Sequence, residues 1–377
     1  MRIYLDNAAT TPVRPEAAKA AIDAMTVRYG NPSSSHTMGR EATEMLESAR
    51  AQLAEALGAK PEELHFTSGG TEGINTAIRM GALSMSRRGK HIISSLAEHS
   101  ATTHSLDELE KQGFSVTRLK PQRDGSVSVE QVEAALRDDT VMVSLMLVNN
   151  ETGGVTDIAA VSQLLKSKNS PALLHTDAVQ GFLKVPFTVK SLGVDLLSLS
   201  GHKIHAPKGV GALFIRDGVK IHPLLVGGPH EGNLRAGTQA MPAIMALGVA
   251  SQLGSRELTE SLRHMSQLKA ALQSRLTDEI PGLQILSGAA PHIISISLPG
   301  HRSETLMNFL EAREIFVSKS SACKKGARSH VLEAIELPPA VIDGALRIGL
   351  SHYSTLEEIT ALIDSLKEAF ETLFKKL

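Results

Sequence analysis

Lys203 is the residue whose surroundings most directly suggest chemistry. It lies in the stretch SLSGHKIHAPKGVGALFI, in a tight turn between two apolar segments. A lysine close to a protein core loses solvation, which favours its neutral amine, and neutral amines form Schiff bases with carbonyl compounds. Lys208 is a competitor, but it follows Pro207 and precedes a glycine turn, so we expect it to face solvent. His202 and His205 alone would suggest a metal ion, yet no further ligand cluster stands at a suitable spacing, so we expect no metal.

The stretch FTSGGTEG, residues 66–73, follows an expected strand and opens an expected helix. Its small residues let backbone N–H groups converge on an anion at the start of the helix. An ordinary helix cap, with Ser68 or Thr71 as the capping residue, explains the same pattern. The stretch matches neither the P-loop lysine pattern nor a full G-x-G-x-x-G, so a phosphate site and a cap both remain open.

Asp177 stands in LLHTDAVQ, at the carboxyl end of an expected apolar strand. Open α/β sheets place ligand groups at this end of their strands. A buried carboxylate must be paired, because desolvating a bare charge is costly, although a strand-end aspartate is also a common cap. A turn lysine, a strand-end carboxylate and an anion cradle together are the groups that pyridoxal phosphate (PLP) needs for its aldehyde, ring nitrogen and phosphate.

Cys323 is the single cysteine, and it stands in SKSSACKKGAR among basic and small polar residues rather than on an apolar face. Neighbouring Lys319, Lys324, Lys325 and Arg328 would stabilise a thiolate, the nucleophilic form of cysteine. One cysteine forms no intramolecular disulfide, which fits a reducing compartment. Because the start of the chain also lacks the layout of a signal peptide, we expect a cytoplasmic protein.

Helical and strand patterns alternate over most of the chain, which predicts an α/β layout with a largely parallel, buried sheet. From about residue 251 the pattern becomes that of a smaller α+β unit. We expect helices at 15–29, 41–57, 71–85, 100–112, 157–166, 251–276, 304–313 and from 356 on. We expect strands at ELHFTS, HIISS, SVTRL, VMVSLMLV, ALLHTD, DLLSLS, GVGALFI and HIISISL.

The composition favours an ordinary globular protein. Of the 377 residues, 42% are hydrophobic and 21% charged, with 39 basic against 40 acidic residues. No overall charge draws the chain to nucleic acid or to anionic membranes, so we expect no direct nucleic-acid partner. No apolar run approaches the roughly 20 residues of a membrane helix, so we expect no membrane partner either.

The order and spacing of short motifs resemble one enzyme family. The motifs are YLDNAATTP, GNPSSSH, FTSGGTEG, AEHSA, VNNETG, HTDAVQ, SLSGHKIHAPKGVGAL, RAGT, SSAC and LRIGLS. They are similar to those of the cysteine desulfurases of the NifS and IscS type, within the class V, fold-type I PLP-dependent enzymes. The resemblance implies a homodimer whose large domain, residues 12–255, has a mainly parallel seven-stranded sheet. The small α+β domain, residues 1–11 and 256–377, carries the cysteine loop.

The resemblance also implies roles for individual residues. Lys203 is expected to form the Schiff base with PLP, His99 to stack on its ring and move protons, and Cys323 to be the nucleophile. Asn150 and Arg347 are expected to hold the substrate, with the forked guanidinium of Arg347 on its carboxylate. Taken alone, His99 would more often be a structural histidine, Arg347 would be a paired structural arginine about as often as a ligand, and Asn150 could cap a turn. The cofactor-binding residues are expected to be Gly70, Thr71, His99, Asp177, Gln180, Ser200, His202, Lys203 and Thr238, the last from the second subunit.

The implied reaction converts L-cysteine to L-alanine. Lys203 removes the α-proton, Cys323 takes the sulfur as a persulfide, and the sulfur passes to an acceptor protein. Two alternatives stay open: another PLP reaction, such as that of a selenocysteine lyase or an aminotransferase, and a nucleotide-binding or catalytically silent protein that reuses the fold.

Overall fold

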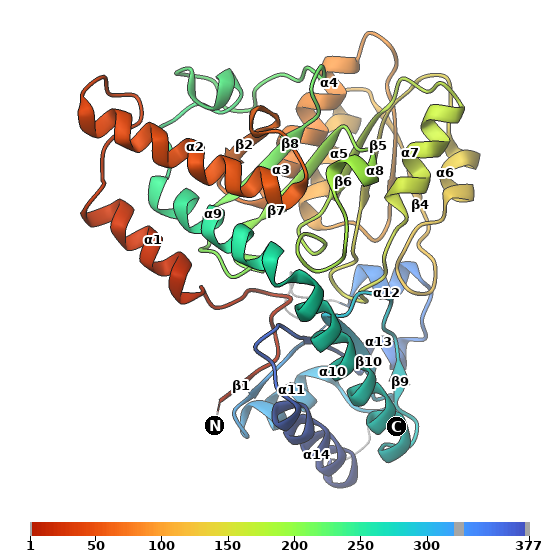
Figure 1. The fold of residues 1–377 in the computed structure, drawn as a ribbon. Coiled ribbons are helices and arrows are strands. Elements are labelled where there is room, and N and C mark those ends of the chain that lie inside the picture. The colour runs from red at the N-terminus through yellow and green to blue at the C-terminus, as the bar shows by residue number, and fades with distance from the viewer. Residues whose placement is uncertain (1, 320–327, 374–377) are drawn as a thin grey trace.

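A seven-stranded sheet forms the centre of the larger part of the molecule (Figure 1). The computed structural model describes residues 2–319 and 328–373. The strand order is β2-β8-β7-β6-β5-β3-β4, and β8 alone among these strands runs antiparallel to its neighbours. The expected mainly parallel seven-stranded sheet is therefore confirmed. Its strands are Leu64–Thr67 (β2), His91–Ser95 (β3), Ser115–Leu119 (β4), Thr140–Met146 (β5), Leu173–Asp177 (β6), Leu196–Ser200 (β7) and Gly211–Ile215 (β8).

Helices cover both faces of this sheet because its strands are apolar on both sides. In β7, Leu196 packs into the core on one face and Leu197 into the core on the other. Successive side chains of a strand point to opposite faces, so a strand buried on both faces reads as a continuous apolar run. One face carries α3 (Gly70–Asn75), η2 (Thr76–Met80), α4 (Gly81–Met85) and α5 (Ser100–Lys111). The other carries α1 (Pro15–Thr26), α2 (Thr37–Leu57), α6 (Val129–Ala135), α7 (Ile158–Ser167), α8 (Val189–Leu192) and α9 (Met241–Arg256).

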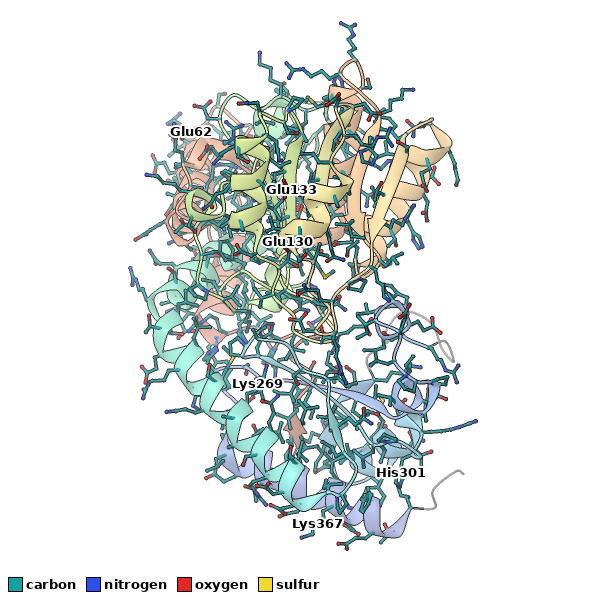
Figure 2. All side chains as sticks on the ribbon, turned by 90° about the vertical axis from the view of Figure 1, so that its right-hand side faces the viewer. Glu62, Glu130, Glu133, Lys269, His301 and Lys367 are labelled. Atoms are coloured by element: carbon teal, nitrogen blue, oxygen red, sulfur yellow. The ribbon has the colours of Figure 1, made fainter. Side chains whose placement is uncertain are left out.

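The smaller part contains an antiparallel sheet in the order β12-β13-β10-β9 and a parallel pair of β1 with β11. Figure 2 shows this part below the larger one, with Lys269 and Lys367 labelled on its helices. Its strands are Ile3–Tyr4 (β1), Gln284–Ile285 (β9), Ile293–Ser297 (β10), Ile315–Phe316 (β11), Ser318–Lys319 (β12) and Ala345–Gly349 (β13). Its helices are α10 (Leu258–Glu279), α11 (Ser303–Glu311), α12 (His330–Ala334), α13 (Pro339–Asp343) and α14 (Leu356–Thr372).

The division into residues 12–255 and residues 1–11 with 256–377 stays a prediction, and two features support it. Ile3 and Leu5 share a core with α10, α11 and α14 rather than with the seven-stranded sheet. The long helical pattern that we placed at 251–276 is in fact two helices, α9 and α10, separated at Glu257. The expected helix therefore had the wrong bounds, because its pattern runs through the break.

Most other expected elements are confirmed, with ends that shift by a few residues. α2 begins at Thr37 rather than at residue 41 because the ring of His36 accepts the amide of Gly39 and so caps the helix. It ends before Gly58, whose φ of 67° fits the left-handed conformation at a helix end. α6 and α8 were missed because each is a single short stretch of helix. No helix in the described ranges is long and apolar enough to cross a membrane.

Candidate active site

The turn that carries Lys203 is held by the N-terminal segment of the chain. Residues Gly201–Lys203 (η3) follow the end of β7. The amide of Thr11 donates to the carbonyl of His202 over 2.9 Å, and the hydroxyl of Thr11 accepts from the amide of His205 over 2.8 Å. His205 has φ of 65°, a left-handed conformation that is unusual for a residue with a side chain. The motif YLDNAATTP therefore clamps the lysine turn, although the two are far apart in sequence.

The amine of Lys203 is partly buried and donates to two backbone carbonyls. Its Nζ atom lies 2.7 Å from the carbonyl oxygen of Ala8 and 2.7 Å from that of Ala9. Burial, together with the positive charge of Arg347, lowers the pKa of Lys203 to about 8. The neutral fraction near neutral pH is then larger than that of an ordinary lysine, which favours Schiff-base chemistry. Lys208, the competitor, is exposed as expected.

Asp177 lies at the carboxyl end of β6, where we expected it. One carboxylate oxygen accepts the amide of Val179 over 2.9 Å, so the capping interpretation also holds. Burial raises the pKa of Asp177 to about 6, whereas the charge of Lys203 opposes this rise. Gln180 follows on the same loop and donates its amide to the carbonyl of Ala8 over 2.8 Å. A buried carboxylate and an amide thus stand beside the lysine amine.

The glycine-rich stretch forms the start of a helix that no side chain in the described part of the chain caps. The residue that caps α3 is Gly69, so the interpretation of Ser68 or Thr71 as the cap is wrong. The first N–H groups of a helix lack partners within it and are suited to an anion. Gly70 must be small, because a Cβ there would lie 2.6 Å from Cγ2 of Val179. Ser200 is close by, with its Oγ 3.9 Å from where a Cβ on Gly69 would be.

His202 and His99 border the lysine turn from two sides. The ring of His202 lies 3.2 Å from the hydroxyl of Thr10, and burial beside Lys203 lowers the pKa of His202 to about 4. His99 caps α5 by accepting the amide of Ala101 at Nδ1 over 3.1 Å. Burial and the charge of Lys203 lower the pKa of His99, which favours the neutral ring. Because Nδ1 accepts the amide of Ala101, the proton of that neutral ring lies on Nε2.

Arg347 reaches the site from β13 of the smaller part. Its guanidinium donates to Asp6 over 3.1 Å, to the hydroxyl of Ser318 over 2.9 Å and to the carbonyl of Asn150 over 2.9 Å. The Nε atom of Arg347 is buried and has no hydrogen-bond partner among the described residues. The turn-cap role that we considered for Asn150 belongs instead to Asn149, whose side chain accepts the amides of Glu151 and Thr152.

Two expected site residues are not brought into this group. Thr238 is exposed in the segment before α9. Arg235, three residues earlier, pairs with Glu72 over 3.0 Å, which fixes this segment beside α3. Cys323 lies outside the described residues.

Sequence reasoning missed three buried ionisable groups near the site. Burial raises the pKa of Glu98 to about 8 and that of Glu151 to about 7, and it lowers the pKa of Lys184 to about 8. Glu98 and Glu151 stand in the motifs AEHSA and VNNETG, next to the two residues that we had singled out there. Charged residues in otherwise small or apolar motifs were the available signal.

These residues fit PLP by their chemistry. A lysine with a lowered pKa would hold the aldehyde, Asp177 the ring nitrogen and Gln180 the ring hydroxyl. The uncapped N–H groups of α3, with Ser200 and His202, would hold the phosphate. Within the described ranges, no group of three or more histidine, cysteine, aspartate or glutamate side chains is arranged to bind a metal ion.

Known proteins are similar to this chain over nearly its whole length. Residues 3–362 match the model of the class-V aminotransferase family. A cysteine desulfurase IscS from Methanosarcina thermophila is 40% identical over 98% of this chain and 92% of its own. A solved NifS-like protein is 38% identical, with a TM-score of 0.93 over 99% of this chain and 100% of its own. SspA, solved in complex with cysteine, is 32% identical, with a TM-score of 0.81 over 94% of this chain and 100% of its own. The chain belongs to the class-V aminotransferase family and, within it, to the PLP-dependent cysteine desulfurases of the NifS and IscS type.

Proposed function

We propose that this enzyme converts L-cysteine to L-alanine and passes the sulfur, as a persulfide on Cys323, to an acceptor protein. The observation that carries the proposal is the convergence of the Lys203 amine, the Asp177 carboxylate and the Arg347 guanidinium at the carboxyl edge of one sheet. Membership of the cysteine desulfurases supports it, as does the cysteine bound to SspA.

Each side chain has a defined task in this proposal. Arg347 binds the substrate carboxylate, for which its forked geometry is suited, as is its Nε, which has no hydrogen-bond partner within residues 2–319 and 328–373. Asn150 orients the substrate beside it. Lys203 accepts the α-proton, because its lowered pKa keeps part of the amine neutral. His99 can donate a proton from Nε2, since Nδ1 accepts the amide of Ala101. When bound, PLP supplies the electron sink for the carbanion that loss of the α-proton creates.

The sulfur step belongs to Cys323. Its thiolate attacks the substrate sulfur, the carbon–sulfur bond breaks, and its electron pair stays with the carbon fragment that becomes alanine after protonation. Lys324 and Lys325 of the same stretch favour the thiolate, whereas the charges of Lys319 and Arg328 are paired with Glu304 and Asp343. An acceptor protein then takes the terminal sulfur by attack of its own thiol. We expect no direct contact with nucleic acid and place the enzyme in the cytoplasm, where its single cysteine stays reduced.

We also propose a homodimer. Large apolar side chains are exposed along α1 and the segment after it: Ile22, Met25, Val27 and Tyr29. Val226, in the segment that contains Thr238, is 82% exposed. Ser33 and His230 lie 3.4 Å apart, so these two segments adjoin. A second copy would cover this surface and bring Thr238 to its partner's phosphate site.

The test is turnover of L-cysteine by wild-type enzyme and by Cys323→Ser. We expect wild type to form alanine and sulfide in equal amounts in the presence of a thiol. The variant should keep the visible absorption of bound PLP and lose sulfur transfer. Full sulfur transfer by Cys323→Ser would contradict the persulfide role. Turnover of selenocysteine by that variant would indicate a lyase, and turnover that depends on a keto acid would indicate an aminotransferase.

A further inference from the structure

Two consecutive residues after the cysteine stretch contact the larger part of the molecule. Ser329 is buried and its hydroxyl forms a short hydrogen bond with the carboxyl group of Glu151. His330, at the start of α12, donates from Nε2 to the carbonyl of Glu98 over 3.0 Å. The accepting residues, Glu151 and Glu98, are adjacent in sequence to Asn150 and His99. To these two residues we assign substrate binding and proton transfer.

The two loops that receive these contacts are fixed to each other. The side chain of Asn149 donates to the carbonyl of Ala97 over 3.1 Å and accepts the amide of Glu151 over 2.9 Å. The carboxyl group of Glu98 accepts the amide of Met146 over 3.0 Å, which fixes its own backbone. Ser329 and His330 therefore dock on one rigid surface rather than on two independent loops.

The docked end is also rigid on its own side. The hydroxyl of Ser329 accepts the amide of Leu332 over 3.0 Å and so caps α12. Arg328 forms two bonds to the carboxylate of Asp343, at 2.7 Å and 2.8 Å. These contacts on both sides fix the position of residues 328–330 relative to Asn150 and His99.

We propose that Glu151 and His330 are positioning residues for sulfur transfer, because they dock the segment that follows residue 327 onto the loops of Asn150 and His99. The inference rests on the proposed function, in which Cys323 receives the sulfur. Neither side chain touches the reacting atoms in this proposal. Both side chains set the position of the segment that follows Cys323 relative to the substrate site. A displacement of the nucleophile by about 1 Å is enough to slow a reaction markedly.

The experiment compares three variants of the full-length enzyme with the wild type. Glu151→Ala removes the acceptor for Ser329, Glu151→Gln keeps a group of the same shape that can bond to it, and His330→Phe removes the bond to Glu98. Glu333→Ala is the matched control, since Glu333 is exposed on the same helix. Two steps are timed: the spectral change on mixing with L-cysteine, and the gain of one sulfur atom by Cys323, measured by mass spectrometry.

We expect Glu151→Ala and His330→Phe to leave the first step unchanged and to slow the second about tenfold or more, as loss of one hydrogen bond to a charged or buried group predicts. Glu151→Gln and Glu333→Ala should behave as wild type. In the enzyme without PLP, amide hydrogen exchange in His330–Ala334 should be faster in Glu151→Ala than in Glu151→Gln.

Persulfide formation at the wild-type rate in both His330→Phe and Glu151→Ala would overturn the proposal, as would an equal loss in both steps. If Glu151→Ala does not fold, His330→Phe decides alone, because His330 is exposed. These outcomes differ from failure of the proposed function, in which Cys323 itself never gains sulfur.

Discussion

Lys203 and Lys269 lie in different regions of the molecule yet have nearly the same immediate surroundings. Nζ of Lys203 donates to two backbone carbonyls at 2.7 Å each, and Nζ of Lys269 to those of Gly288 and Ala290 at 2.6 Å and 2.7 Å. Burial lowers the pKa of each lysine to about 8. A lowered pKa therefore does not by itself distinguish a reactive lysine from a structural one.

The difference lies in what surrounds each amine beyond its carbonyl partners. Lys203 interacts with the charges of Arg347, Asp6 and Asp177, whereas burial alone accounts for the lowered pKa of Lys269. Lys269 projects from the middle of α10 in the smaller part (Figure 2) and links that helix to the chain before β10. Lys203 projects from a turn at the carboxyl edge of the sheet, where ligands bind. Its position among charged partners distinguishes Lys203, the residue that we propose as catalytic, from Lys269.

The largest expected effect comes from removing each amine in turn. Lys203→Ala should lower turnover of L-cysteine by about a thousandfold or more, since it removes both the attachment of PLP and the base. Lys269→Met should keep the activity and lower the free energy of unfolding by about 1–3 kcal/mol, because two buried carbonyls lose their donor. Turnover and denaturant unfolding of the two variants measure the contrast. Equal losses of activity would break the comparison.

Asp177→Asn tests the role of the carboxylate whose charge acts on Lys203, whereas the pKa of Lys269 is lowered by burial. Without PLP, burial raises the pKa of Asp177 to about 6 from its ordinary value of 3.8. Between about pH 4 and pH 6, Asp177 of the folded state holds a proton that Asp177 of the unfolded state has lost. The stability of the folded state is therefore highest with respect to this group below about pH 4, and it falls as the pH rises through 6. At pH 7 the variant without PLP should be more stable than wild type by up to about 3 kcal/mol, and near pH 4 the difference should vanish.

Unfolding by urea at the two pH values measures this difference. The same variant should bind PLP more weakly, because the ring nitrogen loses its charged partner. A variant that is less stable than wild type at pH 7 without PLP would show that Asp177 is a purely structural carboxylate.

Arg347→Lys has a smaller expected effect and sharpens the comparison further. The positive charge remains, but the forked pair of donors is lost, so kcat/KM for L-cysteine should fall roughly 10- to 100-fold. The pH dependence of the PLP absorption should stay unchanged, because the charge near Lys203 is retained. Arg347→Met, as the matched variant, should move that dependence to higher pH, since the charge of Arg347 lowers the pKa of Lys203. An identical pH dependence of the PLP absorption in Arg347→Lys and Arg347→Met would contradict the effect of the Arg347 charge on the pKa of Lys203.

The sequence could predict the elements and the motifs but not the contacts between distant segments. Apolar runs and the strand-end Asp177 were sufficient to place the sheet and its active edge. That the carbonyls of Ala8 and Ala9 hold Lys203 could not be read from spacing, because the bonds join residues 194 and 195 positions apart. Glu151 gave a signal only as a charge in a small motif, and its partner Ser329 gave none. The observed helix ends differ from the predicted ones where the capping residue is of an unusual type, as with His36 at the start of α2.

The most direct test of the central claim is to find which lysine carries PLP. Borohydride reduction of the loaded enzyme, followed by peptide mass mapping, fixes the cofactor to the lysine that binds it. We predict that the added mass lies on the peptide that contains Lys203 and that the peptides of Lys269 and Lys184 are unmodified, although burial lowers the pKa of all three. Modification of Lys269 or Lys184 in place of Lys203 would contradict the assignment.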